Sequence, residues 1–404
     1  MESCPRQALL LAGGLLALAL ALPLLLIAPA QAAPAAALTV CPAGPPDCGY
    51  SIVQDAVDAA QPGTTIKIAV GTYTGVNHHG GLAQVVYVDK SLTLRGGYTA
   101  PAFAEPPDPE ANPTTLDALG LGRVLYVGGS IDATVEGLRI TGGNAAGLGG
   151  YVAPWGTYDA GGGIYAITAT VVLSANEIVS NTIPSQGDGS GGGVASLHSN
   201  VALVGNRVRG NDADRGGGLY ESTSSLEANT IVSNTAGAGG GVYASEGDTT
   251  LLQTELISNT AFYGGGLYAW DGYLISNHAA FLGNIADNDG GGLFVRGSEV
   301  TLLDSDITGN TAEFSGGGLY LDQSPATLGR NTPAAGHGAV SRPHRSLCRQ
   351  EPNGAAHRRQ SRPFGSASDF RVSHADFAAF SRPLTVTGRR YGSAVPRPAS
   401  VGRS

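Results

Sequence analysis

The chain has 404 residues, 61 of them glycine, and a formal net charge of −9 at pH 7. An acidic chain of this kind opposes binding to the phosphate backbone of nucleic acid, and it has no motif for a nucleotide or nicotinamide cofactor. Nucleic acid is therefore excluded as a partner, and nucleotide-dependent chemistry is set aside.

Residues 1–32 are typical of a secretory signal peptide. Arg6 precedes an apolar stretch over residues 8–28, and the small residues at 30–32 suit a cleavage site. We therefore expect export, with the mature protein secreted or held at the cell surface. The apolar stretch is also long enough to remain as a membrane anchor, so an uncleaved signal would be the protein's membrane contact.

Residues 33–49 are interpreted as a linker. Cys41 and Cys48 lie close together in the sequence, and in an oxidising compartment they can close a small loop by a disulfide. Metal binding by this pair is the weaker alternative, because no histidine stands beside them at zinc-ligand spacing.

A short amphipathic helix is expected next, followed by irregular strands. The helix signal combines a capping-box spacing, an apolar face and a terminal glycine: Ser51 and Gln54; Ile52, Val53, Ala56, Val57 and Ala60; Gly63. We expect this helix to cap the open end of a stack of strands, because an uncovered edge invites pairing with other chains. Strands are predicted at 65–69, 85–88, 92–94 and 124–127, with a proline-rich surface loop over 99–113.

Residues 136–328 contain a regular repeat. A glycine triplet begins at Gly161, Gly191, Gly216, Gly239, Gly264, Gly290 and Gly316, and an asparagine recurs in step at Asn181, Asn211, Asn234, Asn259, Asn284 and Asn310. A period near 25 residues restricts the fold to solenoids, propellers and arrays. Each triplet is followed by a short alternating run, and no segment between the markers is long enough for a helix. The repeat therefore predicts a coil with two or three short parallel strands per turn.

The repeated residue types suit such a coil. Glycine permits positive φ and close backbone approach at a corner that recurs on every turn. An inward asparagine can bond to the next asparagine and to turn backbone, so we interpret the asparagine column as structural.

The Gly-Gly-Gly-Leu-Tyr runs, together with the segment 281–284, resemble the repeats of polymorphic outer-membrane proteins. The chain over about residues 50–328 resembles right-handed parallel β-helix proteins of the pectin-lyase-like superfamily. This resemblance implies an all-β right-handed parallel β-helix with an exported location. It does not imply one activity, since that fold hosts lyases, hydrolases, adhesins and spacers.

Candidate site residues lie in the turn between asparagine and triplet, where the repeats differ most in length. The turns after Asn144 and Asn181 are long, and variable insertions on one face usually mark the working face of a solenoid. The candidates for ligand binding are Tyr151, Trp155, Tyr158, Asp159, Asp188, Asp212 and Asp214. Aromatic rings beside carboxylates suit sugar recognition, and Asp159, Asp188 and Asp214 are expected to converge as a weak calcium site. The competing interpretation is that these aspartates are ordinary turn formers.

A second aromatic feature follows the triplets, at Tyr165, Tyr220, Tyr243, Tyr268, Phe294 and Tyr320. This column is predicted to self-stack and set the register, with a sugar-binding track as the alternative.

Residues 329–404 break with the rest of the chain. Residues 330–404 hold 13 arginines, no lysine and 3 acids, whereas residues 1–329 hold 10 basic residues and 29 acids. A genuine basic tail would suit an acidic polymer or an anionic membrane. Because period, charge sign and strand pattern are lost together, we favour translation in a wrong frame.

Two functions remain. The first is a non-catalytic exported β-helix that binds extracellular polysaccharide or another cell-surface component. The alternative is an extracellular polysaccharide lyase or glycoside hydrolase, which would need basic or paired acidic residues concentrated on one face. Basic residues are scarce between residues 140 and 329, so the sequence favours the first.

Overall fold

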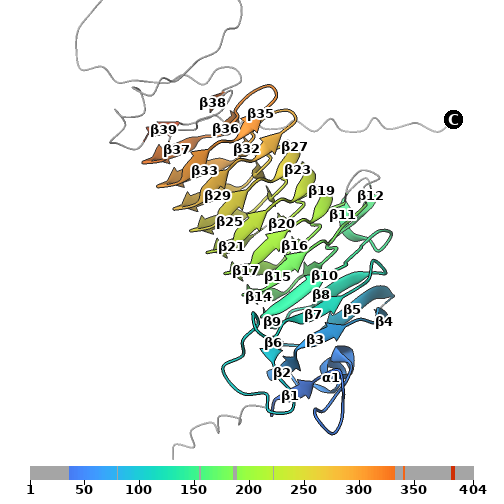
Figure 1. The fold of residues 1–404 in the computed structure, drawn as a ribbon. Helices are drawn as coiled ribbons and strands as arrows, with labels where there is room; N and C mark the ends of the chain where they lie inside the picture. The colour runs from blue at the N-terminus through green and yellow to red at the C-terminus, as the bar shows by residue number, and fades with distance from the viewer. Residues whose placement is uncertain are drawn as a thin grey trace, which may run out of the picture. The chain divides into compact units, whose positions relative to one another are not determined.

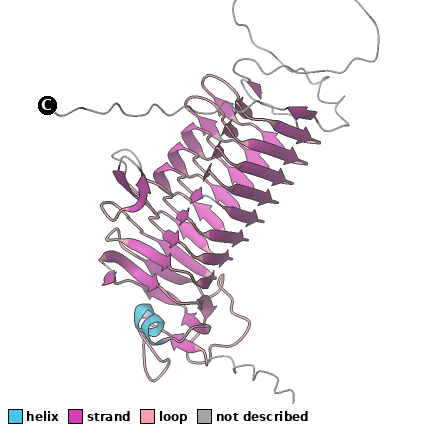
Figure 2. Cartoon of the chain, turned by 180° about the vertical axis from the view of Figure 1, so that it is seen from behind, coloured by secondary structure: helices cyan, strands magenta, loops and turns pink. Residues whose placement is uncertain are grey.

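In the computed structural model, the described residues are 36–79, 81–153, 156–184, 189–221 and 223–332, with two short strands at 340–341 and 384–386. The described residues between 36 and 332 wind into a coil, and the strands of each turn pair in parallel with their counterparts on the next turn (Figures 1 and 2). The expected all-β solenoid is confirmed. The signal segment at 1–32 and most of the basic tail lie outside the described residues.

Three long sheets, here called A, B and C, run the length of the coil, and a shorter sheet D joins them in later turns. Sheet A contains β1 (Leu38–Val40), β2 (Thr64–Ala69), β6 (Leu92–Tyr98), β9 (Asp132–Glu136), β14 (Thr170–Ser174), β17 (Asn200–Val204), β21 (Ser224–Glu227), β25 (Asp248–Leu252), β29 (Tyr273–Asn277), β33 (Glu299–Leu303), β37 (Ala326–Gly329) and the antiparallel β39 (Leu384–Val386). Sheet B contains β3 (Gly71–Tyr73), β7 (Thr114–Asp117), β10 (Leu138–Thr141), β15 (Glu177–Val179), β18 (Arg207–Arg209), β22 (Thr230–Val232), β26 (Glu255–Ile257), β30 (Ala280–Leu282) and β34 (Asp306–Thr308).

Sheet C contains the antiparallel β4 (Asn77–His79), then β5 (Leu82–Val88), β8 (Arg123–Gly128), β13 (Ile164–Ile167), β16 (Val194–Leu197), β20 (Leu219–Glu221), β24 (Val242–Ser245), β28 (Leu267–Trp270), β32 (Leu293–Arg296), β36 (Leu319–Asp322) and β38 (Val340–Ser341). Sheet D contains β19 (Asp212–Arg215), β23 (Thr235–Ala238), β27 (Thr260–Tyr263), β31 (Ile285–Ala286) and β35 (Thr311–Ala312). A regular turn therefore runs from the glycine triplet through strands of C, A, B and D to the next triplet.

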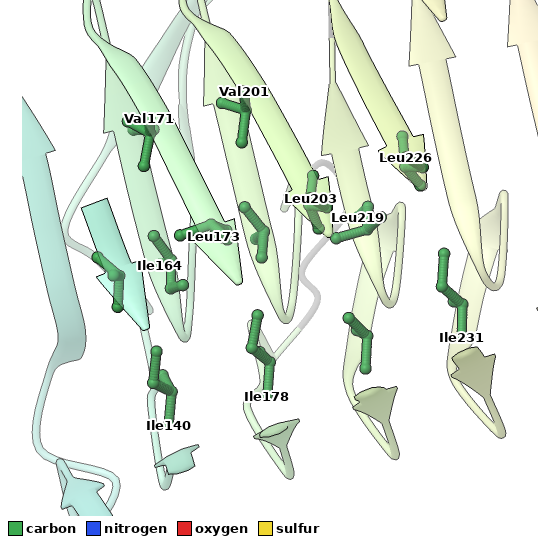
Figure 3. Packing of buried hydrophobic residues seen from close by; sticks show 14 of the residues in the cluster. Ile140, Ile164, Val171, Leu173, Ile178, Val201, Leu203, Leu219, Leu226 and Ile231 are labelled. Atoms are coloured by element: carbon green, nitrogen blue, oxygen red, sulfur yellow. The ribbon is translucent and has the colours of Figure 1, made fainter. Parts of the chain in front are cut away.

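Aliphatic side chains fill the interior of the coil in register. Alternate residues of each strand point inward, so equivalent positions form columns such as Ile140, Ile178, Val208 and Ile231 in sheet B. Figure 3 shows Ile140, Ile178 and Ile231 of this column. One larger side chain, Phe281, continues this column and is fully buried. Ser276 of sheet A is also fully buried on the same turn, so a small side chain leaves room where a large one enters.

The glycine triplets form the expected corners. The first glycine of each triplet has φ between 62° and 72°, a conformation that strains other residues. The second and third glycines are required by the neighbouring turn. A Cβ atom on Gly241, for example, would lie 2.6 Å from the carbonyl oxygen of Gly266.

The asparagine column is a continuous buried ladder, as predicted. From Asn181 to Asn284, each Nδ2 donates to Oδ1 of the next asparagine over 2.9–3.1 Å, and each backbone N–H donates to the same oxygen. Each Nδ2 also donates to a sheet B carbonyl of the preceding turn. Every polar atom of these amides is thereby satisfied inside the stack.

A second ladder lies at the corner between sheets A and B and was not predicted. Asn176 donates to Asn206, and Asn206 donates to Asn229, in the same pattern. Later turns carry Thr254, Ala279, Ser305 and Asn331 at the equivalent position, where Ser305 donates its backbone N–H to Asn331. The coil therefore keeps its register through Asn331 and Thr332, a few residues beyond the expected end at 328.

The expected N-terminal helix is α1 (Val53–Ala59), which packs against β1, β2 and β5 and buries Val53, Ala56 and Val57. Two details of the prediction were wrong. Ile52 is 52% exposed, and Ser51 and Gln54 form no capping box. The amide of Gln54 instead bonds with the backbone of Tyr87 in β5, because this contact satisfies a buried side chain and a strand amide together.

Cys41 and Cys48 are joined by a disulfide with a Cα to Cα distance of 5.9 Å. The loop over 99–113 connects β6 to β7 as expected. Among the described residues, no helix has the length and apolar character needed to span a membrane.

The aromatic column outside sheet C is self-stacked, as favoured from the sequence. Successive rings from Tyr220 to Tyr320 lie 4.8–5.2 Å apart with interplanar angles of 21° or less. Tyr165, Tyr220, Tyr243 and Phe294 are nearly fully buried. The ring faces are covered by one another, so they are not offered to a sugar.

Candidate functional site

The first long insertion is a β-hairpin on the side of the coil (Figure 1). Its strands are β11 (Gly150–Ala153) and β12 (Gly156–Asp159), and their register sets Tyr151 opposite Tyr158. The backbones of these two residues are therefore paired directly across the hairpin. Trp155, at the turn, lies outside the described residues.

The base of this hairpin is held by Arg123, at the start of β8. Arg123 donates from Nε to the carbonyl oxygen of Ala160 over 2.8 Å and from one terminal nitrogen to that of Gly149. Tyr165 adds a bond from its hydroxyl to the carbonyl oxygen of Gly150 over 2.8 Å. These three carbonyls lie on both sides of the hairpin, so the two side chains tie both of its ends to the coil.

Arg123 is an unusual residue for this position. Its guanidinium is fully buried and lies 4.8 Å from the centre of the Tyr165 ring, and no salt bridge to it is present in the described part of the chain. Burial lowers the pKa of Arg123 to about 10, against the opposing effects of Tyr165, Asp159 and Tyr126. A buried cation is costly unless it is well bonded. The hydrogen bonds that offset this cost for Arg123 are the ones that hold the hairpin.

Sequence reasoning missed Arg123. The residue at the equivalent corner of the next turn is Gly162, the second glycine of a triplet, where a Cβ would meet the carbonyl oxygen of Gly192 at 2.7 Å. Later turns have glycine at this corner, so an arginine there could have marked Arg123 as unusual. The two positions can be recognised as equivalent only when the register of the strands is known.

Both carboxylate oxygens of Asp159 accept hydrogen bonds from backbone N–H groups of the same insertion. Oδ1 accepts a hydrogen bond from the backbone N–H of Gly149 over 2.7 Å, and Oδ2 accepts one from Gly147 over 2.8 Å. Hydrogen bonds to a charged acceptor are among the stronger ones. Asp159 therefore shapes the hairpin base beside Arg123.

Asp214 serves the second insertion in a similar manner. Its Oδ2 accepts a hydrogen bond from the N–H of Gly189 over 3.0 Å, and Ser190 donates its N–H to the backbone oxygen of Asp159. The bases of the two long insertions thus lie on adjoining turns, as expected. The carboxylates of Asp159 and Asp214 nevertheless bond to different amides.

Asp212 and Asp214 lie two residues apart in β19. Burial, followed by the negative charge of Asp214, raises the pKa of Asp212 above its usual range. Asp212 lies at the start of β19 and still contacts solvent, so its burial is only partial; Asp214 is half-buried.

The expected calcium ligands are only partly placed. Asp188 lies outside the described residues, so the site formed by Asp159, Asp188 and Asp214 stays a prediction. Within the described ranges, no group of three histidine, cysteine, aspartate or glutamate side chains is arranged to hold a metal ion.

A second exposed aromatic position was not singled out from the sequence. Trp270 and Tyr273 flank the corner between sheets C and A and are 38% and 48% exposed. In register, Trp270 lies between Ser245 and Arg296, so tryptophan is exceptional in this column.

Comparison with known proteins gives one family. No curated protein and no solved structure matches the chain. The family model described as the right handed beta helix region matches residues 123–333, just over half of the chain, and ends one residue after the last turn described above. The parallel strands, the stacked corners and this match agree: the chain belongs to the right-handed β-helix family.

Proposed function

We propose that the protein is an exported β-helix, secreted or held at the cell surface, that binds extracellular polysaccharide without cleaving it. The observation that carries this proposal is the hairpin β11–β12. It sets Tyr151 opposite Tyr158 on a base held by Arg123, Tyr165 and Asp159.

The chemistry of this hairpin suits a sugar chain. A tyrosine offers a flat apolar face for a pyranose ring and a hydroxyl for its polar edge. A hairpin anchored at both ends has lost much of its freedom before binding, so less entropy is lost when the ligand is held. Neutral or basic polysaccharides are favoured over acidic ones, because the coil itself is acidic.

Export is part of the proposal. It is supported by the character of residues 1–32 and by the disulfide between Cys41 and Cys48, since such bonds persist in oxidising compartments. The resemblance of the repeats to polymorphic outer-membrane proteins fits the same location. Sequencing the N-terminus of protein recovered from the medium or envelope should give a start near residue 33.

Binding is tested by affinity electrophoresis through gels that contain individual polysaccharides. Wild-type protein should be retarded by at least one polymer, and Tyr158→Ala should lose most of that retardation. Tyr273→Ala is the matched control, since it removes an exposed tyrosine from sheet A and should leave the retardation unchanged. Equal retardation of wild type and Tyr158→Ala would contradict binding by the hairpin.

The second candidate function is polysaccharide cleavage by a lyase or glycoside hydrolase. The raised pKa of Asp212, to which the negative charge of Asp214 contributes, favours it, because a carboxyl that holds its proton more tightly can act as a general acid. Release of reducing ends or of unsaturated products, lost in Asp212→Asn, would establish this function in place of simple binding.

A further inference from the structure

An ionisable side chain lies inside the coil, in an inward column of sheet C. In register, this column contains Ala166, Ser196, Glu221, Ala244, Ala269, Val295 and Leu321. Glu221 is 2% exposed, so its carboxyl is within the core of the solenoid. No feature of the repeat requires a carboxyl at this position, because alanine occupies it on the next turn.

Two hydroxyl side chains of sheet A face the same part of the interior. Ser224 and Thr249 replace the apolar residues Val201 and Leu274 of the flanking turns, and both are buried. Oε1 of Glu221, the Ser224 hydroxyl and the Thr249 hydroxyl have no well-formed hydrogen bond in the described part of the chain. Three buried polar side chains therefore cluster next to the buried Ser196, between the apolar Val201 and Leu274 of sheet A.

Within the described residues, the elements packed around Glu221 bring no charged side chain to the cluster. The neighbouring strands of sheet C place Ser196 and Ala244 beside it, and sheet B contributes Ile231 to the interior of its turn. The titratable residues of the adjoining corners are exposed: His198, Glu246 and Asp248. Burying an ionised carboxylate here, with no cation among the described residues around it, is a costly arrangement.

We propose that Glu221 is a proton-binding site inside the coil, which makes the stability of the central turns depend on pH. A protonated carboxyl is neutral and can donate to one hydroxyl while accepting from the other. The ionised form can only accept, and it must be drawn toward water.

The direction of the pH dependence follows from burial. Burial raises the pKa of Glu221 to about 7, and the hydroxyls of Ser224 and Thr249 lower it only in part. Because the folded pKa lies above the unfolded value, the contribution of Glu221 to stability is fully present below the unfolded pKa. It is lost as the pH rises through the folded pKa.

The test compares thermal melting at pH 5.5 and pH 8.5 for wild type, Glu221→Gln and Glu227→Gln. Wild type should melt roughly 5 °C lower at pH 8.5 because of this site. Glu221→Gln, which cannot ionise, should lose about that much of the pH dependence. Glu227→Gln removes an exposed glutamate from the adjoining strand and should keep the wild-type dependence. Equal pH dependence in wild type and Glu221→Gln would overturn the proposal.

A second measurement does not rely on a variant. Hydrogen exchange of the wild type should be faster at pH 8.5 than at pH 5.5 in β20, β21, β24 and β25, after correction for the intrinsic effect of pH. The turns beyond residue 290 should show no such change. A uniform response along the coil would also overturn the proposal.

Discussion

Asn234 and Asn259 lie on successive turns of the coil, and Nδ2 of the first donates to Oδ1 of the second over 3.0 Å. The backbone N–H of Asn234 donates to the same oxygen, and Nδ2 of Asn259 donates back to the carbonyl oxygen of Ile231. Nδ2 of Asn259 also donates to Oδ1 of Asn284 on the following turn, so one amide joins three turns.

Replacing Asn259 by alanine should be strongly destabilising. The change leaves the N–H and Nδ2 of Asn234 without their acceptor, and buried groups left unsatisfied cost about 1–3 kcal/mol each. We expect a loss near 3 kcal/mol and a fall in melting temperature of roughly 6–12 °C. Asn200→Ala, at an exposed position of sheet A, should change the melting temperature by less than about 1 °C. Similar melting of both variants would show that the ladder adds little.

Two glycines at corners of the coil separate two effects of substitution, namely backbone strain at positive φ and steric overlap of a Cβ with the neighbouring turn. Gly205 has φ of 63° with nothing near a Cβ, so Gly205→Ala should cost about 1 kcal/mol through backbone strain alone. Gly241 lacks a positive φ, but its Cβ would meet the backbone of Gly266 at 2.6 Å. Gly241→Ala should therefore prevent normal stacking and lower the melting temperature by far more than Gly205→Ala. Differential scanning calorimetry measures both melting temperatures, and a larger fall in Gly205→Ala than in Gly241→Ala would contradict this prediction.

The regular part of the fold was predictable because the same physical demand recurs on every turn. Glycine recurs at each triplet for one physical reason, and asparagine recurs at each ladder position for another. A single sequence therefore shows each requirement several times. The second ladder was missed because it changes from Asn229 to Thr254 and Ala279, and only the register shows that these positions are equivalent.

Features that occur once were harder to predict. The amide of Gln54 bonds with a backbone 33 residues away, so no local pattern could separate this role from a capping box. Arg123 holds a hairpin whose ends are 26 and 37 residues further along the chain. Asp159 and Asp214 lie near the bases of the two long insertions, but the sequence does not tell which backbone amides their carboxylates accept.

The basic tail leads to a prediction about the coding DNA. The ladder at Asn331 is in register, so the next turn requires an asparagine near residue 336 and a glycine triplet near residue 341. The chain has glycine at 336 and no triplet there. If the frame changes in this region, another frame of the same DNA should encode both markers. Another frame without them would favour a genuine basic tail.

Calcium should have little effect on stability if Asp159 keeps its present contacts. Its two oxygens already accept the N–H groups of Gly149 and Gly147, and a cation would compete with both. Melting in millimolar calcium and in chelator should therefore differ by less than about 2 °C, since a weak ligand stabilises little by mass action. A larger shift that is absent from both Asp188→Ala and Asp214→Asn would establish the calcium site expected from the sequence.

Arg123→Met should loosen the hairpin while leaving the coil folded. Methionine keeps much of the side-chain volume but cannot donate to the carbonyl oxygens of Gly149 and Ala160. Removing a buried cation also removes its desolvation cost, so the global melting temperature should change by only a few degrees. The hairpin should open more often, and chymotrypsin should cleave it after Tyr151 or Tyr158 about 10-fold faster.

Arg209→Met is the control, because this arginine pairs with Glu177 on the outside of sheet B and does not touch the hairpin. Polysaccharide retardation should weaken in Arg123→Met only. An unchanged cleavage rate would show that Tyr165 and Asp159 hold the hairpin without the arginine.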